Sequence, residues 1–195
     1  MAKAGRRQTT YVALLRGVNV GGKNNVSMQA LKESFEAIGL EDVRTYINSG
    51  NILFRSTASD ARALERAIDR ILSGGHRLES KAVVRSEAEM TRLVKTIGRR
   101  WRSNAAWKFN VMFLRHTVDS PRVLDGIALK AGIEEAFYCP GTLLWSARLD
   151  AFNRTAMKKM VGQPLYQEMT IRSVSTTHKI LDLMRQMPAP VSFQS

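Results

Sequence analysis

The sequence predicts an α+β protein made of two tandem ferredoxin-like halves, each an antiparallel sheet with helices on one face. Two observations predict this fold. Apolar runs of strand length and helical periodicities follow one another in the order β-α-β-β-α-β over the first half of the 195 residues, with a further helix behind them. The same order returns in the second half, after a join near Trp101–Ala106. The repeat is one of element order, without a clear repeat of residues.

Each element of the first half has a local signal. Ser27 and Ser59 stand where helix N-caps are expected, and Ser86-Glu-Ala-Glu89 is a capping box. Gly39 stands where the first helix ends, and Asn48-Ser-Gly-Asn51 reads as the turn of a hairpin. The predicted elements are, in order, a strand over Tyr11–Leu15, a helix over Ser27–Ile38, strands over Val43–Ile47 and Ile52–Arg55, a helix from Ser59 to Gly74-Gly75, a strand over Lys81–Arg85 and a helix from Ser86 to about Ile97.

The second half carries the same kinds of signal. Ser120-Pro121 is an N-cap followed by a proline at the first helical position, and Cys139-Pro-Gly-Thr142 is a turn between two strands. Pro188 ends the last helix. The predicted elements are a strand over Lys108–Leu114, a helix from Ser120 to about Ala131, strands over Glu134–Tyr138 and Leu143–Ala147, a helix over about Asn153–Val161, a strand over Glu168–Arg172 and a helix over Thr176–Met187.

The predicted organisation is a flexible basic tail over residues 1–9, a first half over 10–100, and a second half over 101–195 that includes the closing helix. The chain shows neither a run of about 18 apolar residues nor a secretory signal, so we expect no membrane association. The single cysteine, Cys139, excludes an internal disulfide and favours the cytoplasm. A net charge of +13 favours polyanionic partners, although a basic protein without such a partner carries the same signal.

Three stretches resemble the DUF1697 family of uncharacterised, mostly bacterial proteins: ALLRGVNVGGKNNVSM (Ala13–Met28), VRTYINSGNILF (Val43–Phe54) and TIRSVSTTHKI (Thr170–Ile180). The third stretch departs from the family pattern, because Ser173 and Ser175 stand where asparagines are usual. The family residues that it keeps are Thr170, Arg172, Thr176 and Lys179. The resemblance implies a fold of paired ferredoxin-like halves and implies no activity, and a ligand contact that needs an amide at either serine is in question.

A basic, glycine-rich loop follows the first strand and is the main candidate site. Gly17-Val-Asn-Val-Gly-Gly22-Lys23-Asn24 departs from a P-loop at its last position, where Asn24 replaces the hydroxyl that binds Mg²⁺. We therefore expect anion binding and no nucleotide hydrolysis, with backbone N–H groups and positive charge presented to the ligand. The alternative is a structural loop. The candidate ligand-binding residues are Arg16, Asn19, Gly21, Gly22, Lys23 and Asn24.

Two further groups of polar residues extend this prediction. Asn48 and Asn51 should lie beside the loop, because the first and third strands are central neighbours in a ferredoxin-like sheet; the alternative is an ordinary hairpin turn. Arg172, Ser175 and Thr176 form a second candidate anion cradle where a strand meets a helix, although helix capping alone explains the two hydroxyls.

The alternative partner is nucleic acid. Basic residues alternate with Trp101, Trp107 and Phe109, a combination suited to phosphate contact and base stacking, although charge runs are more often solvated faces. The basic residues are Arg92, Arg99, Arg100, Arg102 and Lys108.

Catalytic chemistry finds little support. The three histidines show no metal-ligand spacing, and we expect Glu134 and Glu135 to be solvated at a strand start. No catalytic residue or metal ligand is assigned, and the cofactor stays unknown. The sequence thus favours a protein that binds a phosphorylated small molecule or nucleotide. Its alternatives are a nucleic-acid-binding module and an enzyme of unrecognised class built on the same loop.

Overall fold

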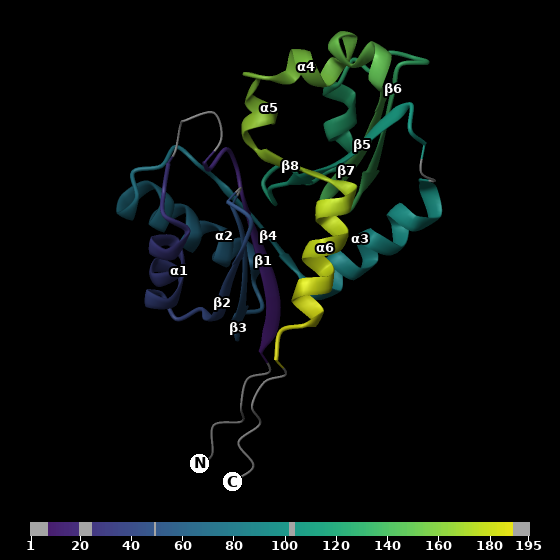
Figure 1. The fold of residues 1–195 in the computed structure, drawn as a ribbon. Helices are drawn as coiled ribbons and strands as arrows, with labels where there is room; N and C mark the ends of the chain where they lie inside the picture. The colour runs from purple at the N-terminus through teal and green to yellow at the C-terminus, as the bar shows by residue number, and fades with distance from the viewer. Residues whose placement is uncertain (1–7, 20–24, 49, 102–103, 189–195) are drawn as a thin grey trace. The chain divides into compact units, whose positions relative to one another are not determined.

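The computed structural model describes residues 8–19, 25–48, 50–101 and 104–188 (Figure 1). The chain divides into two compact units. Unit 1 draws on the ranges 1–90 and 180–195, and unit 2 is Thr91–Lys179. Within the described ranges, no helix combines the length and the apolar character needed to cross a membrane.

Unit 1 contains a four-stranded antiparallel sheet in the order β2-β3-β1-β4 (Figure 1). This is the strand order of a ferredoxin-like fold, in which the first and third strands lie at the centre. The strands are β1 (Thr9–Leu15), β2 (Glu41–Tyr46), β3 (Asn51–Ser56) and β4 (Ala82–Ser86).

Two helices cover one face of this sheet. Helix α1 spans Met28–Ala37 with Ser27 as its N-cap, and helix α2 spans Ala61–Arg70 and continues as a π-helical turn over Ile71–Gly75. The N-cap of α2 is Asp60, whose Oδ1 accepts a hydrogen bond from the N–H of Arg62 at 2.9 Å. The sequence predicted Ser59 as the N-cap, which was wrong by one residue, because the helix begins one residue later, at Ala61.

The core of unit 1 lies between the sheet and these helices. The ring of Tyr11 stacks on that of Phe54 with centroids 5.7 Å apart, and Phe35 of α1 meets Phe54 edge-on. The opposite face of β1, which carries Val12 and Leu14, is also fully buried. Burial on both faces explains why β1 is a continuous apolar run without alternation.

Helix α2 also protects the free edge of β4. The N–H of Val84 donates to Glu65 Oε1 at 3.0 Å, and the N–H of Ala82 donates to Asp69 Oδ1 at 2.9 Å. Glu65 and Asp69 are four residues apart and so lie on the same face of α2. Ala82 and Val84 are two residues apart, so their N–H groups point to the same side of β4. The two carboxylates therefore replace a missing neighbouring strand.

Unit 2 repeats the sheet, in the order β6-β7-β5-β8 and again antiparallel throughout. The predicted α+β fold of two similar ferredoxin-like halves is therefore confirmed. The strands are β5 (Trp107–Leu114), β6 (Glu134–Cys139), β7 (Thr142–Arg148) and β8 (Met169–Ser173).

The connections of unit 2 are shorter helices than the sequence predicted. The helix expected from Ser120 to Ala131 is a 3-10 helix over Pro121–Gly126, after which Ile127 is extended. The helix expected over Asn153–Val161 is broken by Thr155, whose backbone is extended and whose hydroxyl donates to the carbonyl oxygen of Phe152. The resulting pieces are η3 (Leu149–Arg154), α4 (Ala156–Met160) and α5 (Pro164–Gln167).

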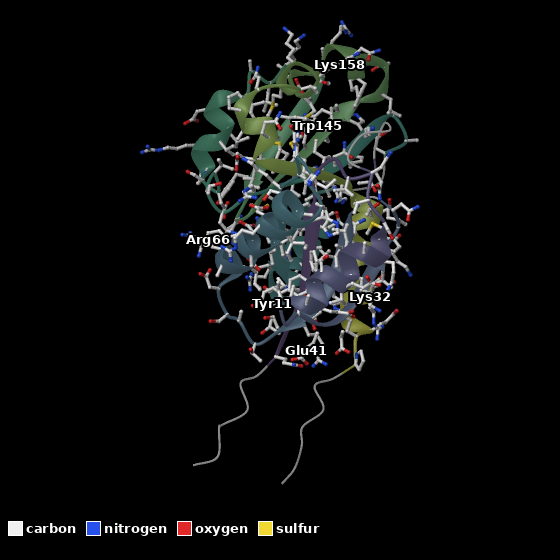
Figure 2. The ribbon with its side chains drawn as sticks, turned by 90° about the vertical axis from the view of Figure 1, so that its left-hand side faces the viewer. Tyr11, Lys32, Glu41, Arg66, Trp145 and Lys158 are labelled. Atoms are coloured by element: carbon white, nitrogen blue, oxygen red, sulfur yellow. The ribbon has the colours of Figure 1, made fainter. Side chains whose placement is uncertain are left out.

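The core of unit 2 centres on Trp145, which is 1% exposed and is labelled in Figure 2. It packs with Met112 and with Met157 and Met160 of α4, and Phe152 meets its ring edge-on. Methionines fill the irregular space that short connecting helices leave above the sheet.

The two remaining helices follow the last strand of each sheet. Helix α3 spans Glu87–Arg100 and α6 spans Val174–Arg185. The predicted capping box of α3 is present, because Ser86 Oγ accepts from the N–H of Glu89 and Glu89 Oε2 accepts from the N–H of Ser86.

Candidate functional site

The C-terminal end of β1 meets the beginnings of β3 and β4. The N–H of Leu15 donates to the carbonyl oxygen of Gly50 at 2.7 Å, and the N–H of Arg16 donates to that of Lys81 at 3.0 Å. We call this part of unit 1, made of Arg16, Asn48, Gly50, Asn51 and Lys81, the loop edge. The strand order thus places the turn before β3 beside Arg16, as the sequence pattern indicated.

Gly50 fits closely against the end of β1. Its φ is +72°, in the left-handed region, and a Cβ added there would lie 2.7 Å from the Cβ of Leu15. Both features require glycine. The turn can therefore approach β1 only because this position has no side chain.

Asn19 closes the base of the glycine-rich loop. Its Oδ1 accepts from the N–H of Val26 at 2.8 Å, and its Nδ2 donates to the carbonyl oxygen of Val26 at 3.0 Å. Its backbone has φ 54°, a conformation that asparagine tolerates better than most residues. Asn19 therefore uses its amide to hold the two ends of the loop together. The predicted ligand residues Gly21, Gly22, Lys23 and Asn24 lie outside the described residues.

The two asparagines of the turn before β3 differ in exposure. Asn51 is fully buried, and its Nδ2 donates to the carbonyl oxygen of Tyr46 at 3.1 Å. Asn48 is exposed, and Arg16 is half-buried. Of the described candidate residues, Asn19 in the glycine-rich loop and Asn51 at the loop edge thus bond to the backbone, whereas Arg16 and Asn48 reach the surface.

The structure reveals a residue-level repeat that the sequence pattern did not show. In unit 2 the N–H of Leu114 donates to the carbonyl oxygen of Gly141, and the N–H of Arg115 donates to that of Glu168. These bonds correspond to those of Leu15 and Arg16 in unit 1. The corresponding pairs are Leu15 and Leu114, Arg16 and Arg115, Gly50 and Gly141, Asn51 and Thr142, and Lys81 and Glu168.

The repeat extends to the end of the fourth strand. Arg85 Nη1 donates to the carbonyl oxygen of Val84 at 2.7 Å, and Arg172 Nη1 donates to that of Ile171 at 2.9 Å. Each arginine is followed by the serine that caps the next helix. The signal was present as Val84-Arg-Ser and Ile171-Arg-Ser, but three residues are too few to establish a repeat without the register.

One corresponding pair differs in the sign of its charge. In unit 2, Glu168 Oε2 lies 3.2 Å from Arg115 Nε in a largely buried ion pair. In unit 1 the place of Glu168 is taken by Lys81, which is exposed and has the same charge as Arg16. At this pair of positions the loop edge therefore has two basic residues, whereas unit 2 has a basic and an acidic residue.

The second predicted cradle belongs to unit 2, whereas the loop edge belongs to unit 1. Arg172 Nη1 also donates to Thr170 Oγ1 at 2.8 Å, and burial lowers its pKa to about 10, so the guanidinium stays charged at neutral pH. Ser173, not Ser175, caps α6, because its Oγ accepts from the N–H of Thr176 at 3.1 Å. The same oxygen also lies 2.9 Å from the hydroxyl oxygens of Ser175 and Thr176. The hydroxyl of Ser173 thus bonds to each of the other two.

The basic segment of the nucleic-acid alternative is divided between two faces of the second sheet. Trp101 packs on Phe109 with ring centroids 5.1 Å apart, whereas Lys108 Nζ lies 4.6 Å from the centroid of the Phe152 ring. Lys108 and Phe109 are consecutive strand residues and so point to opposite faces. Arg92 and Arg99 are exposed on α3, the side chain of Arg100 is not described, and Arg102 lies outside the described residues.

The expected solvation of Glu134 was wrong. Glu134 is 3% exposed, and its carboxylate accepts from Trp145 Nε1 at 2.9 Å and from the N–H groups of Ala156 and Lys130 at 2.6 and 3.2 Å. It therefore joins β6, β7 and α4, while its neighbour Glu135 is exposed. Within the part of the chain that the structure describes, no group of three His, Cys, Asp or Glu could hold a metal ion.

A serine and a histidine meet in unit 1 without the arrangement of a catalytic pair. Ser34 Oγ lies 2.9 Å from His76 Nε2, but the same hydroxyl donates to the carbonyl oxygen of Ala30 at 2.9 Å. The hydroxyl hydrogen thus points along α1, and the histidine acts as donor to the serine oxygen. A nucleophilic serine would need the opposite polarity.

Comparisons with known proteins agree with this fold. The family model described as "Protein of unknown function (DUF1697)" matches residues 8–145. Among solved structures, the chain is similar to the conserved bacterial protein SP0830 from Streptococcus pneumoniae, with a TM-score of 0.77 and 28% sequence identity, over 91% of this chain and 99% of that chain. None of the curated proteins compared matches the chain. The descriptions of this family and of this structure name no ligand and no reaction.

Proposed function

Since the chain belongs to the DUF1697 family, whose function is unknown, we propose from the site itself that the loop edge of unit 1 binds a phosphate-bearing small molecule such as a nucleotide. The observation that carries the proposal is the exchange of charge between the two units. Where unit 2 neutralises Arg115 with Glu168, unit 1 places Lys81 beside Arg16. A phosphate group has the negative charge and the acceptor oxygens that arginine and lysine side chains bind in charge-assisted hydrogen bonds.

The surroundings of the two cations suit a phosphate group. In the sequence, Gly21, Gly22 and Lys23 follow a few residues later, which adds a third basic residue and two residues without side chains to the same segment. Asn19 closes the base of this loop, which reduces the conformational freedom lost on binding. Asn48, exposed on the neighbouring turn, adds an amide donor.

A thermal-shift screen tests the proposal. The panel holds inorganic phosphate, sugar phosphates and nucleoside mono-, di- and triphosphates, each at several concentrations and at two salt concentrations. A ligand at about 100 times its Kd stabilises a protein by about 2.7 kcal/mol, which raises the melting temperature measurably. We expect at least one phosphate ester to stabilise the chain, and its unphosphorylated counterpart to have no effect.

Variants locate the site. Arg16→Gln and Lys23→Ala should each remove most of the stabilisation by the phosphate ester. Lys159→Gln removes an exposed cation of α4 in unit 2 and should leave the stabilisation unchanged. If no phosphate ester stabilises the wild type, or if all three variants respond as the wild type does, the loop edge is not an anion site.

A further inference from the structure

Unit 2 holds most of the net positive charge of the chain. Residues 91–179 contain fifteen lysines and arginines and six acidic residues, whereas the whole chain has a net charge of +13. Four of the six acids already have partners within the unit. Glu134 and Asp119 hold hydrogen-bond donors of the fold, and Asp150 and Glu168 pair with arginines. Little negative charge is left to neutralise the surface of unit 2.

The part of α3 that lies in unit 2 concentrates this charge on one line. Arg92, Lys95 and Arg99 are all exposed, and among the residues that the structure describes no ion pair involves any of them. Their spacing of three and four residues places them within about 60° of one another around the helix, over a length of about 10.5 Å. We call these three residues the α3 stripe.

The α3 stripe lies directly opposite the buried face of its helix. Met90, Leu93 and Ile97 are 0%, 7% and 2% exposed, and they fall on the far side of the helical wheel from the three cations. The apolar face of α3 is therefore already buried within the protein and is not available to enter a lipid layer. Gly98, next to Arg99, is also exposed and adds no side chain to the surface, so a partner can approach the helix closely.

The aromatic residues that follow the stripe in the sequence are half-buried. Trp101 contacts Phe109, and Trp107 is half-buried on β5. Lys108, whose side chain contacts Phe152, points to the other face of the sheet. A surface with phosphate-binding cations but without free aromatic faces suits a duplex, whose bases are stacked inside, better than a single strand.

From these observations we propose that the α3 stripe is a binding surface for double-stranded nucleic acid, contacted through its phosphates without reading the base sequence. Arg92, Lys95 and Arg99 each pair with one phosphate. This surface is separate from the loop edge, which belongs to unit 1. Binding is then electrostatic, weak at physiological salt, and the same for unrelated sequences.

The experiment measures affinity by fluorescence anisotropy with a labelled duplex of mixed sequence, at several salt concentrations. Three phosphate contacts predict a slope of log K against log salt of about −2.7. Arg92→Gln, Lys95→Gln and Arg99→Gln should each make this slope shallower by about one and weaken binding to two unrelated duplexes alike. Glutamine keeps the helix propensity of the residues that it replaces, so α3 should stay folded, which circular dichroism checks.

A matched variant removes the same amount of charge from the opposite face of the second sheet. Arg154, Lys158 and Lys159 are exposed on η3 and α4, and Lys158 is labelled in Figure 2. Their combined replacement by glutamine should leave duplex affinity within about twofold of the wild type, whereas the triple stripe variant should lose at least about tenfold. Equal losses in the two triple variants would show an effect of net charge alone and would overturn the assignment to α3.

Other polyanions complete the test. Tighter binding to single-stranded oligonucleotides than to the duplex would overturn the proposal, as would tighter binding to vesicles of anionic lipid. Absence of duplex binding at low salt would also overturn it. None of these outcomes bears on the loop edge, because a phosphate ester that stabilises the wild type should still stabilise the triple stripe variant.

Discussion

The backbone N–H of Arg16 donates a hydrogen bond to the carbonyl oxygen of Lys81 over 3.0 Å. The corresponding bond in unit 2 joins Arg115 to Glu168 over the same distance. The fold thus places one residue beside the arginine in each unit, and the two units fill that place with opposite charges. The backbone geometry is therefore the same in the two units, whereas the charge of the residue beside the arginine is opposite.

The ion pair between Arg115 and Glu168 should contribute to the stability of unit 2. Lys81, which corresponds to Glu168 in unit 1, should contribute little to stability. Glu168→Gln removes a carboxylate that lies 3.2 Å from a side chain of Arg115 that is 9% exposed, so we expect a loss of about 1–3 kcal/mol in the free energy of unfolding. Lys81→Gln changes an exposed side chain and should alter stability by no more than about 0.5 kcal/mol. Urea unfolding of the two variants checks this difference, and equal losses would contradict it.

Gly50 should tolerate no side chain. Gly50→Ala forces a Cβ to within 2.7 Å of the Leu15 Cβ at a φ of +72°, and we expect a loss of about 2–4 kcal/mol. Gly39→Ala is the matched control, since Gly39 has a φ of +82° but open space around it. It should lose only the strain of the backbone, about 1–2 kcal/mol. A control that loses as much as Gly50→Ala would mean that the close approach to Leu15 is unimportant.

Glu134 should be essential to unit 2 although it lies outside any proposed site. Glu134→Ala leaves the donors of Trp145, Ala156 and Lys130 without their acceptor, and we expect a loss of at least about 3 kcal/mol. Near-ultraviolet circular dichroism and tryptophan fluorescence report on Trp145 directly. Glu135→Ala, one residue away and exposed, should change stability by no more than about 0.5 kcal/mol.

Tyr11 should make stability depend on alkaline pH. Burial raises the pKa of Tyr11 above 10.0, the value expected for the unfolded chain, so the folded state holds the phenol proton more tightly. This contribution is fully present below pH 10 and is lost as the pH rises through the higher folded pKa. Tyr11→Phe should show a flatter dependence above pH 10. It should also lose about 1 kcal/mol at neutral pH, with the 2.8 Å hydrogen bond to the carbonyl oxygen of Ala58.

Urea unfolding at several pH values measures both effects of the Tyr11 substitution. The hydrogen bond accounts for the difference at neutral pH, and the phenol proton accounts for the change of that difference with pH. Parallel curves for the wild type and Tyr11→Phe above pH 10 would contradict the role of Tyr11.

Asn19 should couple the loop to the fold. Asn19→Ala removes both hydrogen bonds to Val26, so amide hydrogen exchange at Val26 should become faster. Asn19→Asp keeps the acceptor for the N–H of Val26 and should protect that amide better than alanine does. Affinity for a phosphate ester should be highest in the wild type, lower in Asn19→Asp and lowest in Asn19→Ala. A loop whose two ends are not held together loses more conformational freedom on binding. Unchanged exchange in Asn19→Ala would show that the amide does not hold the loop.

The order of elements could be predicted from the sequence because it rests on local periodicity. All eight predicted strands are present, with ends that shift by one or two residues. The errors lie where contacts between residues far apart in the sequence determine the local structure or the burial of a side chain. The connection after Ser120 looked helical by its cap and proline, but it ends at Gly126. Glu134 looked solvated because its partners, Trp145 and Ala156, become neighbours only in the folded sheet.

The candidate site was predictable in part. The strand order placed Asn48 beside the first loop, and composition pointed to Arg16 and Lys23. Lys81 was missed, because it reaches Arg16 through antiparallel pairing between residues 65 positions apart. No local pattern marks such a residue. Asn19 and Asn51 were predicted as ligand contacts, while the structure shows their amides bonded to the backbone of the site.

The charge of Lys81 should be what makes the loop edge an anion site. Isothermal titration with the phosphate ester that stabilises the chain most tests it, on the wild type, Lys81→Glu and Lys159→Glu. Lys81→Glu gives unit 1 the acid that unit 2 has, whereas Lys159→Glu makes the same charge change on an exposed residue of α4. We predict one binding site in the wild type and in Lys159→Glu, and at least about a tenfold loss of affinity, about 1.4 kcal/mol, in Lys81→Glu. Equal affinities in all three proteins, or no binding to the wild type, would contradict the account.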